Sequence, residues 1–336
     1  MSRLNDFDIL IVGGGPAGLS AAIYLVRAGY KIRVFEKERV GGLLWNAHRV
    51  ENYLGFPGGI GGAELATRFQ DQALSLGVII DQAKISRLRE SRDEPLRGKL
   101  NRRPSPGLRS MSNEGGFIGA AGRKIVRASA VIVASGTRPK HIRLPGCSSL
   151  LGRRVFFEIA SAEADRARGR KALVIGGGDA AFDYAIQWRE RGGEAEILVR
   201  SKIRGLSLLA ARAASLQIPV LCGAEPLCVT ATPSGIRLSF RHEMNIHQRE
   251  GDILFLACGR EPDLECLDDS LRKMIRKPSV KTRCPGLFWA GDVIRGRDRQ
   301  TGIAVGDGLR AAMEADAYLQ KARGRTMTTE DGTWRF

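Results

Sequence analysis

Two glycine-rich segments of this 336-residue chain have the composition of a turn that can hold a phosphate group. One reads DILIVGGGPAGLSAA from Asp8, and the other reads KALVIGGGDAAFDYA from Lys171. In each, an apolar run predicts a buried strand, and glycines allow a tight turn, close approach of a pyrophosphate and close packing of the next helix. That helix would present free N–H groups to the phosphates. The positions with these roles are Gly13, Gly15 and Gly18 in the first segment, and Gly176, Gly178 and Ala181 in the second.

The residues that close the following strand distinguish the two predicted ligands. In KIRVFEK, Glu36 can accept hydrogen bonds from a ribose diol, which suits the adenosine of FAD. In EAEILVRSKIR the strand ends with Arg200, Lys202 and Arg204 and no carboxylate. Guanidinium groups match a 2′-phosphate, so NADPH is favoured over NADH. The alternative is that these cations are ordinary solvated charges. The predicted NADPH site comprises Gly176, Gly178, Asp179, Ala180, Arg200, Lys202 and Arg204.

Composition restricts the class of protein further. No apolar run approaches the length of a membrane span, and no long apolar stretch precedes the first strand, so we expect a cytoplasmic protein that binds no membrane. The six cysteines have neither metal-ligand nor redox-pair spacing, so we expect no metal. The closest pair is Cys222 and Cys228, for which a disulfide is the less favoured alternative.

The net charge of +17 predicts attraction to an acidic partner. We expect no nucleic-acid binding, because the basic residues are dispersed and no nucleic-acid module accompanies them. The densest basic stretch, Arg87 to Arg127, is rich in Pro, Gly and Ser in its middle and predicts a long exposed hairpin or loop. It could equally be a solvated insertion or a docking surface.

The order of elements predicts an α/β protein of two Rossmann-like domains, one inserted into the other. Ala130 to Ala134 forms an apolar strand before the second glycine-rich segment (the second dinucleotide fingerprint), and LFWAGDV forms another strand after it. Both would belong to the first nucleotide domain, so the chain would cross between domains twice. We expect an FAD domain at 1–148 and 280–336, and an NAD(P)H domain at 149–279.

From Phe7 to about Leu319 the chain resembles the low-molecular-weight thioredoxin reductases among the two-dinucleotide flavoproteins. The matching stretches include GGGPAGLSAA, VIVASGTRPK, GGGDAAFDYA and LFWAGDV, and VENYLGFPGGIGG is the most specific of them. The resemblance implies a homodimer that binds FAD and NADPH and whose smaller domain rotates. It also assigns FAD contacts to Gly13, Gly15, Gly18, Glu36, Gly42, Leu44, Asn52, Asp292, Arg299, Gln300 and Thr301.

One departure from that family concerns its redox chemistry. The resemblance places a CxxC shortly before the second fingerprint, but this chain has Ile159 and Ala162 there and no CxxC anywhere. Without thiolates, electrons cannot reach a disulfide by thiol exchange. Ala17 likewise replaces the single cysteine that some reductases of small disulfides carry in the first glycine loop.

Three classes of function therefore stay open. The first is a reductase of ferredoxin or flavodoxin, since some members of this fold lack the dithiol and place a C-terminal ring over the flavin, as Trp334 or Phe336 could. The second is a reductase of a quinone, another small molecule or a small disulfide, with Trp45, Asn46, His48 and Glu158 as residues of a reshaped pocket. His48 could donate a proton there, although a solvated structural role is the alternative. The third is a non-catalytic redox sensor or subunit, which two intact fingerprints disfavour.

Overall fold

The computed structural model describes residues 5–91, 116–161, 167–274 and 279–323. The chain forms two compact units. Unit 1 consists of Met1–Gly42, Ala66–Thr137 and Pro262–Phe336, and unit 2 consists of Leu43–Leu65 and Arg138–Glu261. The domain boundaries expected at 148/149 and 279/280 therefore fall later in the chain than these divisions. The 43–65 segment lies within the range that the sequence assigns to the FAD domain, and in the structure it belongs to unit 2.

Unit 1 is built on a seven-stranded sheet with the order β3-β2-β1-β6-β5-β4, in which β17 also pairs with β6. The strands β1, β2, β3, β6 and β17 are parallel, and β4 and β5 are antiparallel. Their bounds are Asn5–Val12 (β1), Ile32–Glu36 (β2), Ile80–Gln82 (β3), Ile85–Ser91 (β4), Gly116–Ala121 (β5), Lys124–Val133 (β6) and Leu287–Trp289 (β17).

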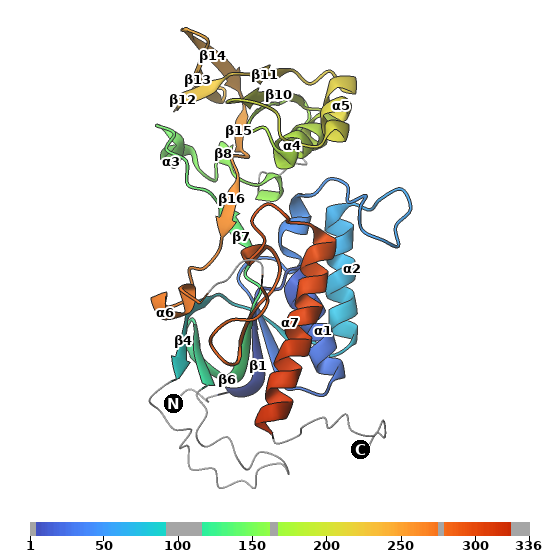
Figure 1. The fold of residues 1–336 in the computed structure, drawn as a ribbon. Coiled ribbons are helices and arrows are strands. Elements are labelled where there is room, and N and C mark those ends of the chain that lie inside the picture. Colours follow the sequence, from blue (N-terminus) through green and yellow to red (C-terminus); the bar gives the residue numbers. More distant parts are fainter. Residues whose placement is uncertain (1–4, 92–115, 162–166, 275–278, 324–336) are drawn as a thin grey trace. The chain divides into compact units, whose positions relative to one another are not determined.

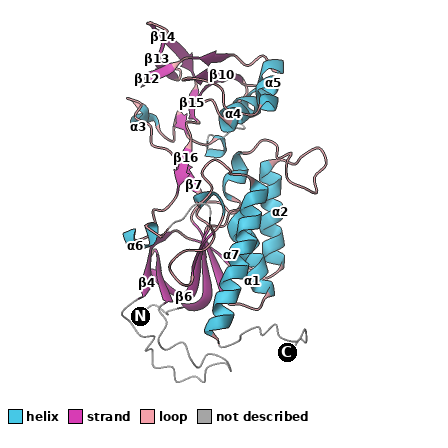
Figure 2. Ribbon diagram, viewed as in Figure 1, coloured by secondary structure: helices cyan, strands magenta, loops and turns pink. Residues whose placement is uncertain are grey.

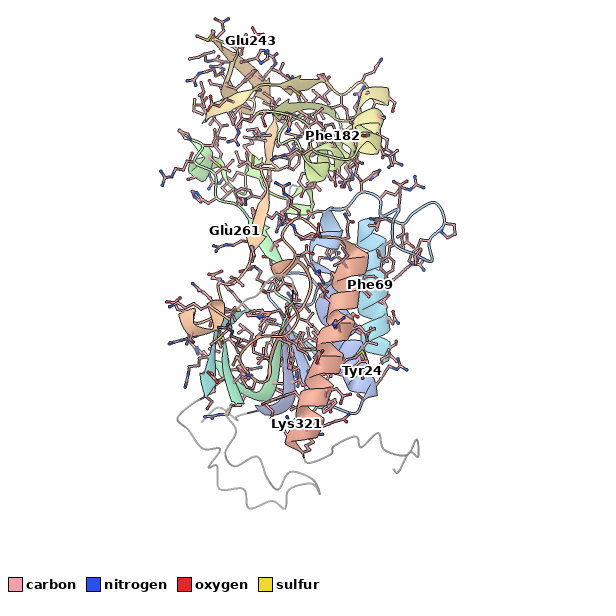
Figure 3. All side chains as sticks on the ribbon, in the orientation of Figure 1. Tyr24, Phe69, Phe182, Glu243, Glu261 and Lys321 are labelled. Carbon is pink, nitrogen blue, oxygen red and sulfur yellow. The ribbon has the colours of Figure 1, made fainter. Side chains whose placement is uncertain are left out.

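Helices cover this sheet, and Figure 1 shows α1, α2 and α7 running alongside one another. The helices of unit 1 are α1 (Pro16–Arg27), α2 (Gly62–Ser75, whose first turn belongs to unit 2), α6 (Asp269–Arg272) and α7 (Thr301–Ala322). Pro16 at the first position of α1 suits a helix start, because its missing N–H would have no partner there. Tyr24, labelled on α1 in Figure 3, donates its hydroxyl to Asp316 on α7, so the two helices are joined by more than apolar packing.

The core of unit 1 explains why the first fingerprint is so apolar. The residues from Ile9 to Val12 are at most 7% exposed, because β1 lies between β2 and β6 and is covered on both faces. Parallel strands of this kind read as continuous apolar runs rather than as alternating patterns. The strands expected from Ile9 and from Ala130 are thus confirmed.

Unit 2 is built on a second, five-stranded parallel sheet with the order β11-β10-β9-β15-β8. Figure 2 shows its labelled strands β10 and β15 beside helix α4. The strand bounds are Val155–Phe156 (β8), Lys171–Ile175 (β9), Glu194–Val199 (β10), Val220–Cys222 (β11) and Ile253–Leu256 (β15), and the helices are α3 (Cys147–Leu150), α4 (Asp179–Glu190) and α5 (Ser207–Ser215). A mostly parallel sheet in unit 1 and a fully parallel sheet in unit 2, each accompanied by helices, confirm the expected α/β class.

Smaller sheets complete the chain. An antiparallel sheet of three strands, β12 (Glu225–Ala231), β13 (Ile236–His242) and β14 (Asn245–Gly251), lies in unit 2, and Figure 3 labels Glu243 in its β13–β14 turn. The strands β7 (Thr137–Pro139) and β16 (Arg260–Pro262) pair where the chain passes between units.

The basic stretch from Arg87 to Arg127 is a hairpin at its ends. Strands β4 and β5 pair antiparallel from Ile85 with Ala121 to Ser91 with Gly116. Leu88 and Phe117 are buried in the core of unit 1, so these ends are core strands and not an exposed loop. Residues 92–115 lie outside the described part of the chain, as do Ala162, Trp334 and Phe336.

All six cysteines are free thiols, so the disfavoured disulfide between Cys222 and Cys228 is not formed. In the described residues, none of the helices has the length and apolarity that crossing a membrane would need.

Candidate dinucleotide sites

The carboxyl ends of four strands meet at one edge of the sheet in unit 1. Val12 pairs with Phe35 on β2 and with Val133 on β6, and Val133 pairs with Trp289 on β17. The segments that follow these strands therefore share one edge, which is where open α/β sheets bind ligands.

The first glycine turn is closely packed except at one position. A Cβ on Gly13, whose φ is 108°, would lie 2.3 Å from the carbonyl oxygen of Ala134, and one on Gly18 would lie 1.9 Å from that of Gly13. These two positions need glycine because the backbone on either side leaves no room. A Cβ on Gly15 would meet nothing within 4 Å, so the backbone is open there as a pyrophosphate requires.

Glu36 connects the end of β2 to this turn. Its Oε2 accepts the Gly14 N–H at 2.7 Å, and its Oε1 accepts the Glu38 N–H at 2.8 Å. The residue is only 7% exposed. Since each carboxylate oxygen can accept a second hydrogen bond, Glu36 can hold the turn and still accept from a ribose hydroxyl.

Two further predicted FAD residues lie beside the same turn. The N–H of Gly41 donates to the carbonyl of Gly14 at 2.9 Å, and a Cβ on Gly42 would come 3.4 Å from the Cα of Gly15. On the other side, a Cβ on Gly291 would lie 2.8 Å from the Cβ of Ala17, which places its neighbour Asp292 next to the glycine loop.

The segment before helix α7 is fixed by an ion pair between Arg295 and a buried carboxylate, which the sequence did not reveal. Arg295 donates from Nε to Asp307 Oδ2 at 2.8 Å and from Nη2 to Oδ1 at 2.5 Å, and Asp307 is 4% exposed. Because Asp307 lies on α7, this ion pair anchors the chain that runs from Arg295 into the helix, and this stretch contains the three predicted residues Arg299, Gln300 and Thr301. Gln300 is the N-cap of α7 and Thr301 its first residue.

The second glycine turn repeats the first in unit 2. A Cβ on Gly176, whose φ is 155°, would lie 2.5 Å from the carbonyl oxygen of Ala257, and one on Gly177 would lie 2.7 Å from Val199 Cγ1. Gly178 again faces open space. The turn precedes α4, so its geometry is that of a second pyrophosphate site.

The cations that are predicted to bind a 2′-phosphate lie in a loop whose backbone forms hydrogen bonds to this turn. The N–H groups of Arg204 and Gly205 donate to the carbonyl of Gly177 at 2.6 and 3.0 Å, and Leu206 N–H donates to Asp179 Oδ1 at 2.7 Å. The side chains of Arg200, Lys202 and Arg204 are exposed, and no carboxylate of the described chain pairs with them. Ala180, the fourth predicted residue of this helix start, is exposed as well.

The position that the resemblance gives to the first cysteine is closed. Ile159 is 1% exposed and belongs to the apolar core of unit 2. The neighbouring Glu158 accepts from Asn46 Nδ2 at one oxygen and pairs with Arg260 Nη1 at the other. Asn46 in turn accepts the Ala160 N–H at 3.1 Å, so a polar network holds the backbone around residue 159.

The 43–65 segment packs on helix α4 of unit 2. Gln187 Nε2 donates to the carbonyl of Asn46 at 2.7 Å, and Asp183 accepts the backbone N–H of His48 at 2.9 Å. The imidazole Nε2 of His48 lies 2.7 Å from Glu190 Oε2, which gives this candidate proton donor a structural partner. The other predicted residues of the segment are Leu44, which is buried, Trp45, which is half-buried, and Asn52, which is exposed.

Residues 7–308 match the family model described as pyridine nucleotide-disulphide oxidoreductase. The chain belongs to this family.

Among curated relatives of this oxidoreductase, the bifunctional thioredoxin reductase/thioredoxin of Mycobacterium leprae is 30% identical over 96% of this chain and 69% of its own. The thioredoxin reductase of Borreliella burgdorferi is 27% identical over 93% and 92% of the two chains. Among solved structures, T. acidophilum thioredoxin reductase aligns with a TM-score of 0.79 and 26% identity, over 94% of this chain and 99% of that one. These likenesses confirm the resemblance to thioredoxin reductases.

Membership of the family makes this chain an FAD-dependent NAD(P)H oxidoreductase, of a thioredoxin reductase-like kind that binds FAD and uses NADPH. The geometry fits both groups. Each unit offers a glycine turn with one position open to a pyrophosphate, at Gly15 and at Gly178. Glu36 is the last residue of β2 in unit 1, and three exposed cations follow β10 in unit 2.

Sequence reasoning missed several residues that shape these sites. Arg260, Gln187, Asp183 and the Arg295–Asp307 pair were not singled out. Arg260, Gln187 and Asp183 contact residues more than 100 positions away, and Arg295 and Asp307 are separated by the start of α7, so spacing could not reveal these contacts. A weak signal existed for Asp183, Gln187 and Asp307, since a polar residue among apolar helix neighbours needs a partner when buried.

Proposed function

We propose that this chain carries electrons from NADPH through FAD to an acceptor other than a thioredoxin-type disulfide. The observation that supports it most directly is the burial of Ile159 at the position of the first cysteine, in a chain without any CxxC. Thiol exchange needs an accessible thiolate, and here the site offers an apolar side chain held inside the core.

In this proposal FAD binds unit 1. The open backbone at Gly15 and the N-terminus of α1 receive the pyrophosphate, Glu36 accepts from the adenosine ribose, and Asp292 accepts from the ribityl hydroxyls. Arg299, Gln300 and Thr301 would lie by the flavin pyrimidine. The assignment of Leu44 and Asn52 to the flavin rests on the resemblance alone.

NADPH binds unit 2 in the same proposal. Gly178 and the start of α4, with Asp179 and Ala180, receive the pyrophosphate, while Arg200, Lys202 and Arg204 bind the 2′-phosphate. Their lack of carboxylate partners in the described chain supports this role, because an unpaired cation is free to bind a phosphate. The domains of the proposal thus keep the expected order, with the NADPH unit inserted into the FAD unit.

The chemistry that FAD supplies when bound is acceptance of hydride from the nicotinamide and delivery of the electrons onward. The chain's part is to bind and orient the two nucleotides. Glu158 contributes by position: with one oxygen on Asn46 and the other on Arg260, it fixes the loop after β8 at the edge where the nucleotide would lie. His48 and Trp45 stay candidates for substrate contact.

For the acceptor we propose a small acidic electron carrier, with ferredoxin or flavodoxin as the best candidates. The net charge of +17 supports this choice, because transient electron-transfer complexes depend on electrostatic steering. We further infer a homodimer, which is typical of thioredoxin reductases, and a cytoplasmic location, which the six free thiols support.

An acceptor panel tests the proposal. The purified flavoprotein, given NADPH, should reduce ferredoxin or flavodoxin at a rate that falls as salt is added, and should leave thioredoxin oxidised. A thioredoxin reductase with its dithiol serves as the positive control for the thioredoxin assay. Turnover of thioredoxin would overturn the proposed route, and reduction of quinones alone would replace the protein carrier with a small-molecule acceptor.

A further inference from the structure

The sheet of unit 2 has one point where the strand order reverses. From β9 the chain proceeds through α4 to β10 and then to β11 on one side, while β15 lies on the other side of β9. In open α/β sheets ligands bind in the crevice at such a point, outside the carboxyl ends of the strands. The crevice here has Gly176 to Gly178 on the β9 side and Cys258 and Gly259 on the β15 side.

Lys140 lies over the β15 side of this crevice. Its backbone N–H donates to the carbonyl of Gly259 at 3.0 Å, and its Cδ would lie 3.7 Å from a Cβ placed on Gly259. Gly259 has a φ of 103°, which favours glycine, and the absent side chain leaves space for the lysine stem. The side chain is exposed, so its ammonium group can reach a ligand.

The neighbouring charges single out Lys140. Arg138 pairs with Glu261 at 3.0 Å, and Arg260 pairs with Glu158, so both of these guanidinium groups are already neutralised. Within the described ranges, no carboxylate pairs with Lys140.

A second cation flanks the same crevice from the other side. Arg200 directly follows Val199, the last residue of β10, and β10 pairs with β9 on the side away from β15. Lys140 and Arg200 therefore stand on the β15 and β10 sides of the crevice, respectively. Two unpaired cations on opposite sides suit a ligand with two separate anionic groups.

We propose that Lys140 binds the pyrophosphate of the nicotinamide dinucleotide on its nicotinamide side, and this inference rests on the proposed NADPH site. The cations after β10 would hold the 2′-phosphate at the adenosine end, whereas Lys140 would act on a group that NADPH and NADH share. Lys140 thus contributes to affinity for both nucleotides, and Arg200, Lys202 and Arg204 contribute to the choice between them.

Binding titrations of the holoprotein with three ligands test this role. NADP⁺ and NAD⁺ contain the pyrophosphate, whereas adenosine 2′,5′-bisphosphate lacks it together with the nicotinamide half. We expect Lys140→Met to raise the Kd for NADP⁺ and NAD⁺ by a similar factor of about ten, the order expected for one charge-assisted contact. The Kd for the bisphosphate should stay unchanged, and Lys140→Arg should retain most of the affinity.

Arg143→Met is the matched control, because it removes one exposed positive charge from the same stretch of chain, and it should leave all three Kd values unchanged. An unchanged NADP⁺ Kd in Lys140→Met would overturn the inference and spare the proposed NADPH site. So would an equal loss for the bisphosphate, which would show a general charge effect. If the unmodified protein binds none of the three ligands, the proposed site itself fails.

Discussion

The backbone N–H of Gly14 donates to Oε2 of Glu36 over 2.7 Å, across 22 positions of sequence. This bond joins the glycine turn after β1 to the end of β2, and it uses no ligand atom to hold the turn. The same carboxylate that would recognise a ribose therefore also preorganises the loop that would hold the pyrophosphate. Such preorganisation lowers the ordering cost of binding.

Glu36→Ala should yield protein that retains much less FAD. The change removes the ribose acceptor and leaves two backbone N–H groups without their partner, at a cost of about 1–3 kcal/mol for each buried donor. The ratio of flavin to protein absorbance after purification measures the effect. Glu38→Gln is the matched control, because that side chain is 80% exposed and its N–H, which Glu36 accepts, is retained. Full flavin content in Glu36→Ala would refute this role.

Neutralising the cations after β10 should change nucleotide preference. Replacing Lys202 and Arg204 by glutamine should weaken the binding of NADPH by about tenfold or more, because each charge-assisted hydrogen bond contributes about 1.5–3 kcal/mol. The binding of NADH should be almost unchanged. Rates of flavin reduction at a series of nucleotide concentrations give the comparison. Arg191 is an exposed residue at the end of α4, and Arg191→Gln should change the affinity for neither nucleotide. Equal losses for NADPH and NADH would contradict a 2′-phosphate site.

Asp183 should make stability depend on pH. Burial raises its pKa, although the His48 N–H and other neighbours oppose the rise, so the folded state holds the proton more tightly than the unfolded state. As pH increases from about 3.9, the ordinary aspartate value, through the raised pKa, the wild type should lose stability relative to Asp183→Asn. Asparagine keeps an acceptor oxygen for His48 and does not titrate.

Thermal unfolding followed by circular dichroism at a series of pH values measures this difference. The gap between the two melting temperatures should move in favour of Asp183→Asn as pH rises, and then level off above the raised pKa. A gap that moves towards the wild type over that range would show that its carboxylate is stabilised in the folded protein.

Thiol labelling should report on the second site. Cys222 is exposed and should react first with a neutral maleimide, whereas Cys147, Cys266 and Cys284 are buried and should react only on unfolding. Cys258 is half-buried at the end of β15, so saturating NADP⁺ should slow its labelling and leave that of Cys222 unchanged. Mass spectrometry of peptides distinguishes the sites. Equal labelling of Cys258 with and without NADP⁺ would argue against binding in that crevice.

Much of the fold could be predicted because its signals are local. An apolar β-branched run followed by glycines identifies a strand and its turn within about 15 residues, as at Ile9 to Gly18. Glu36 and the cations after β10 could be found for the same reason, since their distance from the turn is set by one helix and one strand.

The rest depends on contacts between distant parts of the chain. The packing of the 43–65 segment on α4 joins Asn46 to Gln187 and Glu158, and no spacing rule predicts those partners. The same holds for Arg295 and Asp307, which are close in sequence but are paired only because α7 starts between them. For His48, the sequence suggests either a proton donor or a structural residue. In the structure its imidazole has Glu190 as a partner, which favours the structural role.

In the proposed function this chain reduces FAD with NADPH and has no second redox centre beyond the flavin. Anaerobic titration of the holoprotein with NADPH, followed by flavin absorbance and nucleotide oxidation, tests it most directly. We expect a single equivalent of NADPH per FAD to be oxidised, because one flavin takes up one electron pair. Failure of NADPH to bleach the flavin would contradict the claim, and so would consumption of a second equivalent per FAD, which would reveal a dithiol-type centre.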